Sequence, residues 1–169
     1  MTAPNQITLL RILLIPIFIY FLLANSLPFA GLIAAILFVL IASTDALDGF
    51  IARRNNQVTE LGKLIDPLAD KLLVYGALLA LIELHKISSV PVLILAGRDF
   101  AVMGLRVWAA KNGTIIAASN LAKWKTAVQM IAIPLLILDW PLRVLMFWIS
   151  VALSVYSGWE YFKAADLKE

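Results

Sequence analysis

The sequence predicts an all-α protein that crosses a membrane several times, and three observations lead to this prediction. Hydrophobic residues make up 62% of the 169 residues, and the mean hydropathy is +0.92. Charged residues make up only 15% of the chain, whereas about a quarter is usual in soluble proteins. Apolar stretches long enough to cross about 30 Å of hydrocarbon recur between short polar gaps, without the period-two alternation of strands.

Six helices are expected, because a helix satisfies its own backbone hydrogen bonds in lipid. The first is interrupted by Pro16 and carries Arg11, so it is expected either to span or to lie partly in the interface. The third is expected to begin at Asp66, because Pro67 is tolerated in the first turn of a helix. The expected ranges are Ile7–Leu23, Pro28–Arg53, Asp66–Glu83, Ser88–Ala110, Leu121–Leu138 and Pro141–Ala164.

The remaining helices follow from their apolar runs and the polar residues beside them. The second helix ends where the longest polar stretch begins, at Arg53. The fourth contains Arg98, the fifth begins beside Lys123 and Lys125, and the sixth carries little that is diagnostic of function. No repeat, low-complexity segment or long linker divides the chain, so residues 1–169 are expected to form a single integral membrane catalytic domain.

The distribution of positive charge predicts the orientation in the membrane. Of the 14 lysines and arginines, 12 fall on one side of the predicted bundle, and only Lys86 and Arg143 fall on the other. Because cytoplasmic loops carry an excess of Lys and Arg, both termini and residues 45–70 are expected to face the cytoplasm from the cell membrane. The run Ala24-Asn25-Ser26 resembles a signal-peptidase site, but the membrane spans that follow favour a retained helix over a cleaved signal peptide.

Four aspartates are the most unusual feature of this apolar chain. At 100° per residue, two of them share one arc of about 100° with two small residues on the second helix, and the other two are i, i+4 on the third. These residues are Asp45, Asp48, Gly49 and Ala52, and then Asp66 and Asp70. Grouped carboxylates repel one another unless something compensates them. The chain has no cysteine, and an all-oxygen donor set suits Mg²⁺ or Mn²⁺. The alternative interpretation is that they are ordinary solvated charges at the cytoplasmic ends of the helices.

The same segment resembles the signature of the CDP-alcohol phosphatidyltransferases. Its pattern is Asp-x2-Asp-Gly-x2-Ala-Arg-x8-Gly-x3-Asp-x3-Asp, and every position and gap is present. The matching residues are Asp45, Asp48, Gly49, Ala52, Arg53, Gly62, Asp66 and Asp70. Eight fixed positions with matching gaps over 26 residues make this a specific match.

The resemblance implies a fold, a cofactor and a set of roles. The family fold has six transmembrane helices, is usually dimeric, and places its active site at the cytoplasmic face of the membrane. By that resemblance, the four aspartates bind two Mg²⁺ or Mn²⁺ ions, and Asp70 is also the base for the acceptor hydroxyl. Gly49, Ala52 and Arg53 are then expected to border the cytidine and diphosphate of a CDP-linked lipid.

Two further segments suggest the acceptor. Residues 4–11 and 97–130 resemble the bacterial phosphatidylglycerophosphate synthases, which implies CDP-diacylglycerol as donor and sn-glycerol 3-phosphate as acceptor. Asp99 stands where that subfamily usually has Glu, and Ala122 where it usually has Gly. Arg98 lies about 15 Å into its helix, where an unpaired charge is costly. A cavity lined by basic residues would attract the acceptor phosphate, and the candidates are Arg98, Arg106, Lys123 and Lys125.

Several alternatives remain open from the sequence. The basic residues can instead be snorkelling side chains or contacts to anionic lipids. The acceptor can be another alcohol, such as inositol phosphate or phosphatidylglycerol. An aspartate-rich prenyltransferase or a divalent-cation transporter also places carboxylates near a membrane. However, neither class accounts for the Asp-Gly-x2-Ala-Arg element or for aspartates confined to one level of the bilayer. No nucleic-acid partner is expected.

Overall fold

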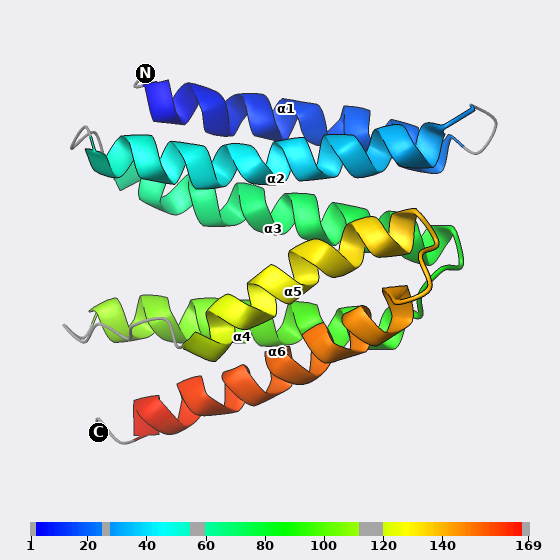
Figure 1. The fold of residues 1–169 in the computed structure, drawn as a ribbon. Coiled ribbons are helices and arrows are strands. Elements are labelled where there is room, and N and C mark those ends of the chain that lie inside the picture. The colour runs from blue at the N-terminus through cyan, green and yellow to red at the C-terminus, as the bar shows by residue number, and fades with distance from the viewer. Residues whose placement is uncertain (1–2, 25–27, 55–59, 112–119, 167–169) are drawn as a thin grey trace. The chain divides into compact units, whose positions relative to one another are not determined.

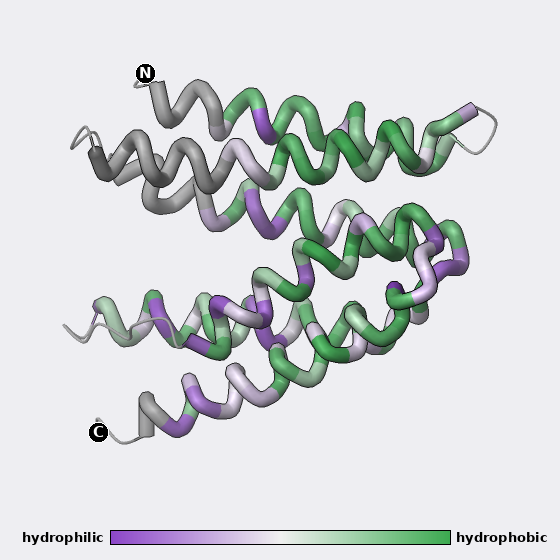
Figure 2. Tube along the Cα trace, viewed as in Figure 1, coloured by the Kyte–Doolittle hydropathy of each residue, from purple (hydrophilic) through white to green (hydrophobic). Residues whose placement is uncertain are grey.

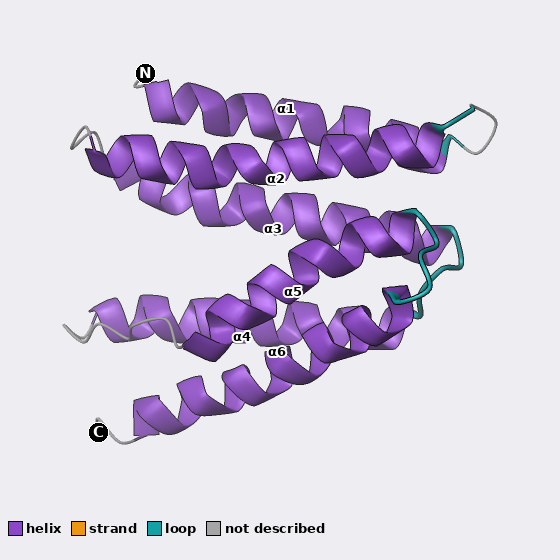
Figure 3. Ribbon diagram, viewed as in Figure 1, coloured by secondary structure: helices purple, strands orange, loops and turns teal. Residues whose placement is uncertain are grey.

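The structure is a computed structural model that describes residues 3–24, 28–54, 60–111 and 120–166, with side chains described over 8–24, 28–44, 67–111 and 120–163. All regular elements in these ranges are helices, which confirms the predicted all-α fold (Figure 3). The helices are α1 (Ala3–Leu23), α2 (Ala30–Arg54), α3 (Glu60–Glu83), α4 (Ser89–Lys111), α5 (Asn120–Ile137) and α6 (Arg143–Asp166). Five of them both begin and end within a few residues of the predicted bounds, and α3 ends at the predicted Glu83 but begins earlier than predicted.

Helix α1 is continuous through Pro16, so the predicted interruption at this residue is wrong. A proline inside a helix removes one backbone hydrogen bond, and the rest of the helix can persist on both sides of it. Arg11 is 2% exposed, and its Nε lies 3.4 Å from the hydroxyl of Thr44 on α2. The charge inside α1 is therefore accommodated by packing against a neighbouring helix.

Helix α3 begins at Glu60 rather than at the predicted Asp66. Pro67 consequently lies inside the helix, and the prediction that it occupies the first turn is wrong. Because Pro67 has no N–H group, α3 loses one backbone hydrogen bond there. The helix nevertheless continues for more than one turn before Pro67. Asp66 and Asp70 are thus held within the first half of α3, on regular helical backbone.

The chain forms two compact units, and the first comprises Met1–Ile87 together with Leu136–Trp140. Within it, α1, α2 and α3 lie side by side (Figure 1). Their core is made of large apolar side chains without solvent exposure, such as Phe18, Leu78 and Leu81. The rings of Phe18 and Phe38 join α1 to α2, with centroids 5.8 Å apart.

The C-terminal end of α3 closes with a left-handed residue. His85 has a φ of 57°, its N–H donates to Ile82, and the N–H of Lys86 donates to the carbonyl of Leu81, each at 2.9 Å. This pair of bonds satisfies carbonyls that a helix end would otherwise leave without partners. His85, the one histidine of the chain, therefore has a capping role in the structure.

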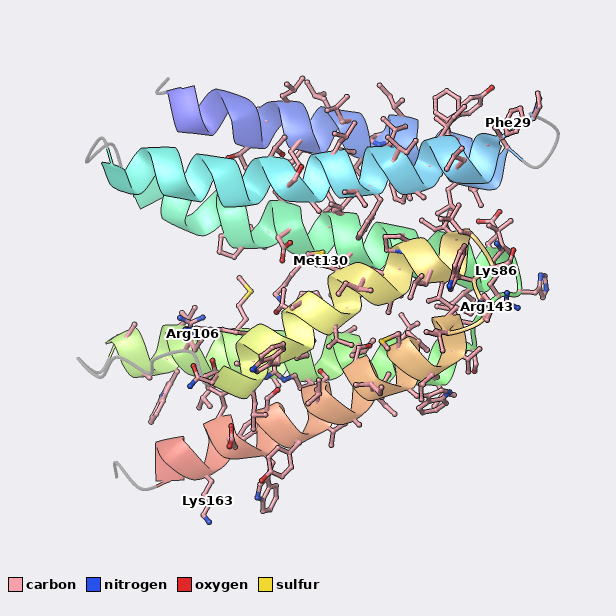
Figure 4. The ribbon with its side chains drawn as sticks, in the orientation of Figure 1. Phe29, Lys86, Arg106, Met130, Arg143 and Lys163 are labelled. Atoms are coloured by element: carbon pink, nitrogen blue, oxygen red, sulfur yellow. The ribbon has the colours of Figure 1, made fainter. Side chains whose placement is uncertain are left out.

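Lys86 then joins the α3 end to the α5 end within the same unit (Figure 4). Its Nζ donates to the carbonyl of Ile137 at 2.8 Å and pairs with Asp139 at 2.6 Å. Positive charge at the C-terminus of a helix is favourable, because the last carbonyls carry partial negative charge.

We expect Lys86→Met to lower the free energy of unfolding by about 1–2 kcal/mol, because charged hydrogen bonds to helix-end carbonyls are lost from a partly exposed site. Thermal unfolding in detergent measures the change. Lys111→Met is the matched control, since Lys111 is exposed and forms no ion pair within the described part of the chain. Equal unfolding midpoints for the two variants would contradict the expectation.

The second unit comprises Ser88–Leu135 and Pro141–Glu169. Its helices α4 and α6 pack along one another, and α5 joins α4 through a buried ion pair between Lys125 and Asp99. Figure 2 shows that the first half of α6 is mostly hydrophobic, whereas the second half carries more polar residues. The prediction that residues 1–169 work as one domain stays a prediction.

Large apolar side chains are abundant on the described surface. Leu93, Trp159 and Leu13 are 72%, 71% and 69% exposed, and Figure 2 shows hydrophobic residues along most of the described length of α2. Within the described residues, no helix combines the length and the apolar character required of a membrane span. The prediction of six transmembrane helices stays a prediction.

Candidate active site

The predicted donor-site residues on α2 all lie in its second half. The backbone is helical from Ala30 to Arg54, so the angular spacing assumed for this stretch applies. The side chains of these residues lie outside the described ones, and their predicted roles stay predictions. They are Asp45, Asp48, Gly49, Ala52 and Arg53.

The other two aspartates lie on α3, in the same compact unit. The side chain of Asp66 is outside the described ones, whereas Asp70 is half-buried and interacts with a partner. Ala69, which precedes Asp70, is 0% exposed, and Leu73, about one helical turn further along α3, is 1% exposed. Among the described side chains, no group of three or more His, Asp or Glu residues is placed to hold a metal ion. Asp70 is the single member of the predicted metal site within that set.

The second unit contains a buried group of charges that we call the Asp99 cluster, formed by Arg98, Asp99 and Lys125. The Nζ of Lys125 donates to both carboxylate oxygens of Asp99, at 2.9 and 2.8 Å. Arg98 Nη1 donates to one of the same oxygens at 3.0 Å. The side chains of Lys125 and Asp99 are each 5% exposed, and that of Arg98 is 13% exposed. One carboxylate is thus shared by two cations, and the cluster carries a formal charge of +1.

Residues of α6 hold the other side of the Arg98 guanidinium. Its Nε donates to the carbonyl of Ser154 at 3.0 Å, and its Nη2 donates to the hydroxyl of Ser157 at 2.7 Å. The guanidinium carbon lies 5.6 Å from the ring centroid of Tyr161, within the range of a cation–π contact. A guanidinium has five N–H groups, and these contacts with Asp99, Ser154 and Ser157 use three of them. Two N–H groups therefore have no acceptor within the described residues.

The remaining candidates for acceptor binding are placed differently. Arg106 and Lys123 are exposed, and Arg106 projects from the C-terminal half of α4 (Figure 4). Within the described residues, no ion pair joins either of them to the Asp99 cluster. The structure therefore brings together Arg98 and Lys125, through Asp99, and leaves Arg106 and Lys123 at the surface.

Two buried polar atoms of this unit have no hydrogen-bond partner within the described residues. They are the amide nitrogen of Gln129, which is 3% exposed, and the hydroxyl of Ser154, which is 0% exposed. Gln129 lies one helical turn beyond Lys125, on the same face of α5. Buried polar groups usually have a partner, so both atoms are available to a water molecule or a polar ligand.

The α6 residues around Arg98 were missed by the sequence analysis, which expected little of functional interest in the last helix. A signal was present, because polar residues recur at i, i+4, i+7 and i+11 in an otherwise apolar helix. These residues are Ser150, Ser154, Ser157 and Tyr161, and all four are at most 4% exposed. The polar stripe therefore faces the interior of the unit and not its surface.

Comparison with known proteins decides the family. The sequence profile of the CDP-alcohol phosphatidyltransferases matches residues 1–156. The chain belongs to the CDP-alcohol phosphatidyltransferase family. The resemblance seen in the aspartate signature is thereby confirmed.

Three relatives of this chain carry the name CDP-diacylglycerol–glycerol-3-phosphate 3-phosphatidyltransferase. The Bacillus subtilis (strain 168) relative is 43% identical, over 94% of this chain and 92% of the relative. The Rickettsia bellii (strain RML369-C) relative is 39% identical, over 95% and 93%. The Haemophilus influenzae (strain ATCC 51907 / DSM 11121 / KW20 / Rd) relative is 33% identical, over 96% and 92%. The similarity therefore spans nearly the full length of both chains.

Proposed function

We propose that this protein transfers the phosphatidyl group of CDP-diacylglycerol to sn-glycerol 3-phosphate, giving phosphatidylglycerophosphate and CMP in phospholipid biosynthesis. The observation that carries this proposal is the near full-length similarity to relatives that bear the name of this reaction. The complete aspartate signature of the phosphatidyltransferase family supports the reaction type.

The reaction exchanges one phosphate ester for another. The oxygen of the acceptor hydroxyl bonds to the phosphorus that carries diacylglycerol, and the bond from this phosphorus to the CMP oxygen breaks. CMP leaves with the electron pair of that bond. Asp70 accepts the proton of the hydroxyl, because a carboxylate at hydrogen-bond distance from an incoming nucleophile assists its deprotonation. Asp70 is half-buried on α3.

Asp45, Asp48, Asp66 and Asp70 would hold the two divalent cations. The donor set fits Mg²⁺ or Mn²⁺, because it consists of carboxylate oxygens. The chain has no cysteine, and its one histidine, His85, caps the far end of α3. When bound, the cations neutralise charge on the diphosphate and favour departure of CMP. Gly49, Ala52 and Arg53 border the cytidine and diphosphate of the donor.

The acceptor phosphate binds to basic residues of the second unit, Arg98, Arg106, Lys123 and Lys125. The Asp99 cluster supports this role, because its net positive charge is buried and two N–H groups of Arg98 are left for phosphate oxygens. Arginine binds phosphate well through parallel N–H groups. Arg106 and Lys123, which are exposed, contribute charge that attracts the anion.

We also propose that the helices cross the cell membrane, with both termini and the active site on the cytoplasmic side, and that the protein is a homodimer. The mean hydropathy of +0.92 and the exposed apolar side chains favour a lipid environment. The lipid tails of the donor then stay in the bilayer while the water-soluble acceptor enters from the cytoplasm. Retention of the protein in the membrane pellet after an alkaline carbonate wash tests this placement.

Release of CMP by the detergent-purified protein tests the reaction. With CDP-diacylglycerol and Mg²⁺, we expect CMP only when sn-glycerol 3-phosphate is added, and we expect EDTA to abolish the release until Mg²⁺ is restored. Inositol phosphate and phosphatidylglycerol are the comparison acceptors. If CMP is released with one of these acceptors instead, the assignment of the acceptor is wrong and the reaction type stands. If CMP is released with none of the acceptors, the proposed reaction is wrong.

A further inference from the structure

Helix α6 holds Arg98 through three different kinds of contact. Arg98 donates a hydrogen bond to the backbone carbonyl of Ser154 at 3.0 Å. It donates another to the side-chain hydroxyl of Ser157 at 2.7 Å. The ring of Tyr161 lies against the guanidinium. Ser154 and Ser157 are 0% exposed and Tyr161 is 4% exposed. The direction of the guanidinium is therefore set mainly by α6, a helix on which it does not lie.

Gly158 provides the space through which the Arg98 side chain passes. A Cβ atom at position 158 would lie 2.8 Å from Cγ of Arg98, 3.3 Å from its Nε and 3.7 Å from its Cδ. The first distance is shorter than real Cβ contacts allow, so an alanine here requires the Arg98 side chain to move. Gly158 lies inside α6, where glycine destabilises a helix relative to alanine. The close approach of Arg98 is a physical reason for a glycine at this position.

The Arg98 side chain has little freedom to move aside. The contact is with Cγ, near the root of the side chain, and not with the flexible end. Beyond Cγ, the guanidinium is fixed by Asp99, Ser154 and Ser157. A displaced Cγ would therefore lengthen at least one of these hydrogen bonds, and it would turn the remaining N–H groups away from their present direction.

We propose that Gly158 and Ser157 are positioning residues for acceptor recognition, acting through Arg98. They fix the guanidinium so that its two remaining N–H groups meet the phosphate of the acceptor. This inference rests on the proposed function of Arg98 in acceptor binding. The match to the family profile ends at residue 156, before both positions.

Gly158→Ala tests the proposal through the kinetics of the two substrates. We expect the KM for sn-glycerol 3-phosphate to rise roughly tenfold or more, because displacement of a binding group by about 1 Å has effects of up to about a hundredfold. The KM for CDP-diacylglycerol is expected to stay within about twofold, since Arg98 acts on the acceptor alone. Gly104→Ala is the matched control, because Gly104 lies inside α4 and a Cβ there meets nothing within 4 Å.

A double-mutant cycle separates positioning from general damage to the helix. In an Arg98→Ala background the clashing Cγ is absent, so Gly158→Ala is expected to change the KM for the acceptor no further. An additional rise in that background would overturn the proposal, as would a wild-type KM in the single variant. If Gly158→Ala does not yield folded protein, Ser157→Ala carries the test. This variant adds no atoms and removes the Nη2 acceptor, so we expect a several-fold rise in the same KM. A wild-type KM for Ser157→Ala would then overturn the proposal.

Binding of inorganic phosphate distinguishes failure of this inference from failure of the proposed function. If the wild-type protein releases no CMP with any acceptor, the proposed function is wrong. Calorimetric titration with phosphate still tests, without any enzymatic assay, whether Gly158 positions Arg98. Weaker phosphate binding by Gly158→Ala than by Gly104→Ala would support the role. Equal binding by the two variants would overturn it.

Discussion

Asp70→Asn is expected to abolish CMP release while CDP-diacylglycerol binding is partly retained. Asparagine keeps one oxygen that can contact a cation, but it cannot accept the proton of the acceptor hydroxyl. Loss of a general base typically costs about 10²–10⁴-fold in rate. The kcat of CMP release measures the loss, and binding of a CDP-lipid analogue in detergent measures what is retained.

Glu83→Gln is the matched control for Asp70→Asn. Glu83 lies on the same helix, α3, but at its opposite end, and it is exposed. Both substitutions replace a carboxylate by an amide of similar size, so a difference between them reports the position and not the chemical change. If Asp70→Asn retains a kcat close to that of Glu83→Gln, then Asp70 is not the base, and the proton goes to another group.

Asp99→Ala is expected to produce the largest loss of stability among single substitutions in the second unit. The carboxylate of Asp99 binds Lys125 through both oxygens and Arg98 through one, and all of these contacts are buried. Removing one partner of a buried ion pair costs about 3–5 kcal/mol, because a charge is left in the interior without compensation. The midpoint of thermal unfolding in detergent should fall accordingly.

Two variants control this prediction. Glu160→Ala removes a half-exposed carboxylate from the same unit, and Glu160 forms no ion pair within the described residues, so its unfolding midpoint should change little. Asp99→Ala combined with Lys125→Met removes one of the two cations that lose their partner, and should be more stable than Asp99→Ala alone. If Asp99→Ala alone is as stable as Glu160→Ala, then Asp99 does not hold the Asp99 cluster together.

The helices of this protein were predictable because hydropathy and chain length decide them locally. The predicted bounds of α4 and α5 differ by a residue from those of the structure. The errors occurred at prolines, where sequence alone suggested an interruption at Pro16 and a first turn at Pro67. Both residues lie inside continuous helices. A long helix can lose one backbone hydrogen bond at a proline because its other backbone hydrogen bonds hold it together. The rule that proline interrupts a helix does not take those other bonds into account.

The pairing of charges in the second unit was not predictable from the sequence. Arg98 and Lys125 were both expected to face an acceptor phosphate, but each also binds Asp99. The contact between Lys125 and Asp99 joins residues 26 positions apart. The contacts of Arg98 with Ser154 and Ser157 join residues 56 and 59 positions apart, so the whole arrangement involves three different helices. No helical period relates such positions, so their distances depend on how the helices pack.

By itself, the sequence determined the all-α class, the six helices and the family, because each of these follows from hydropathy or from spacing along one segment. It also placed the four aspartates on the second half of α2 and the first half of α3. Only the tertiary structure decided that Asp99 is shared by two cations, and that α6 holds Arg98 through Ser157 and the space beside Gly158. The physical reason is that a hydrogen bond or a steric contact requires two atoms within a few ångströms of each other, and for residues on separate helices only packing brings that about.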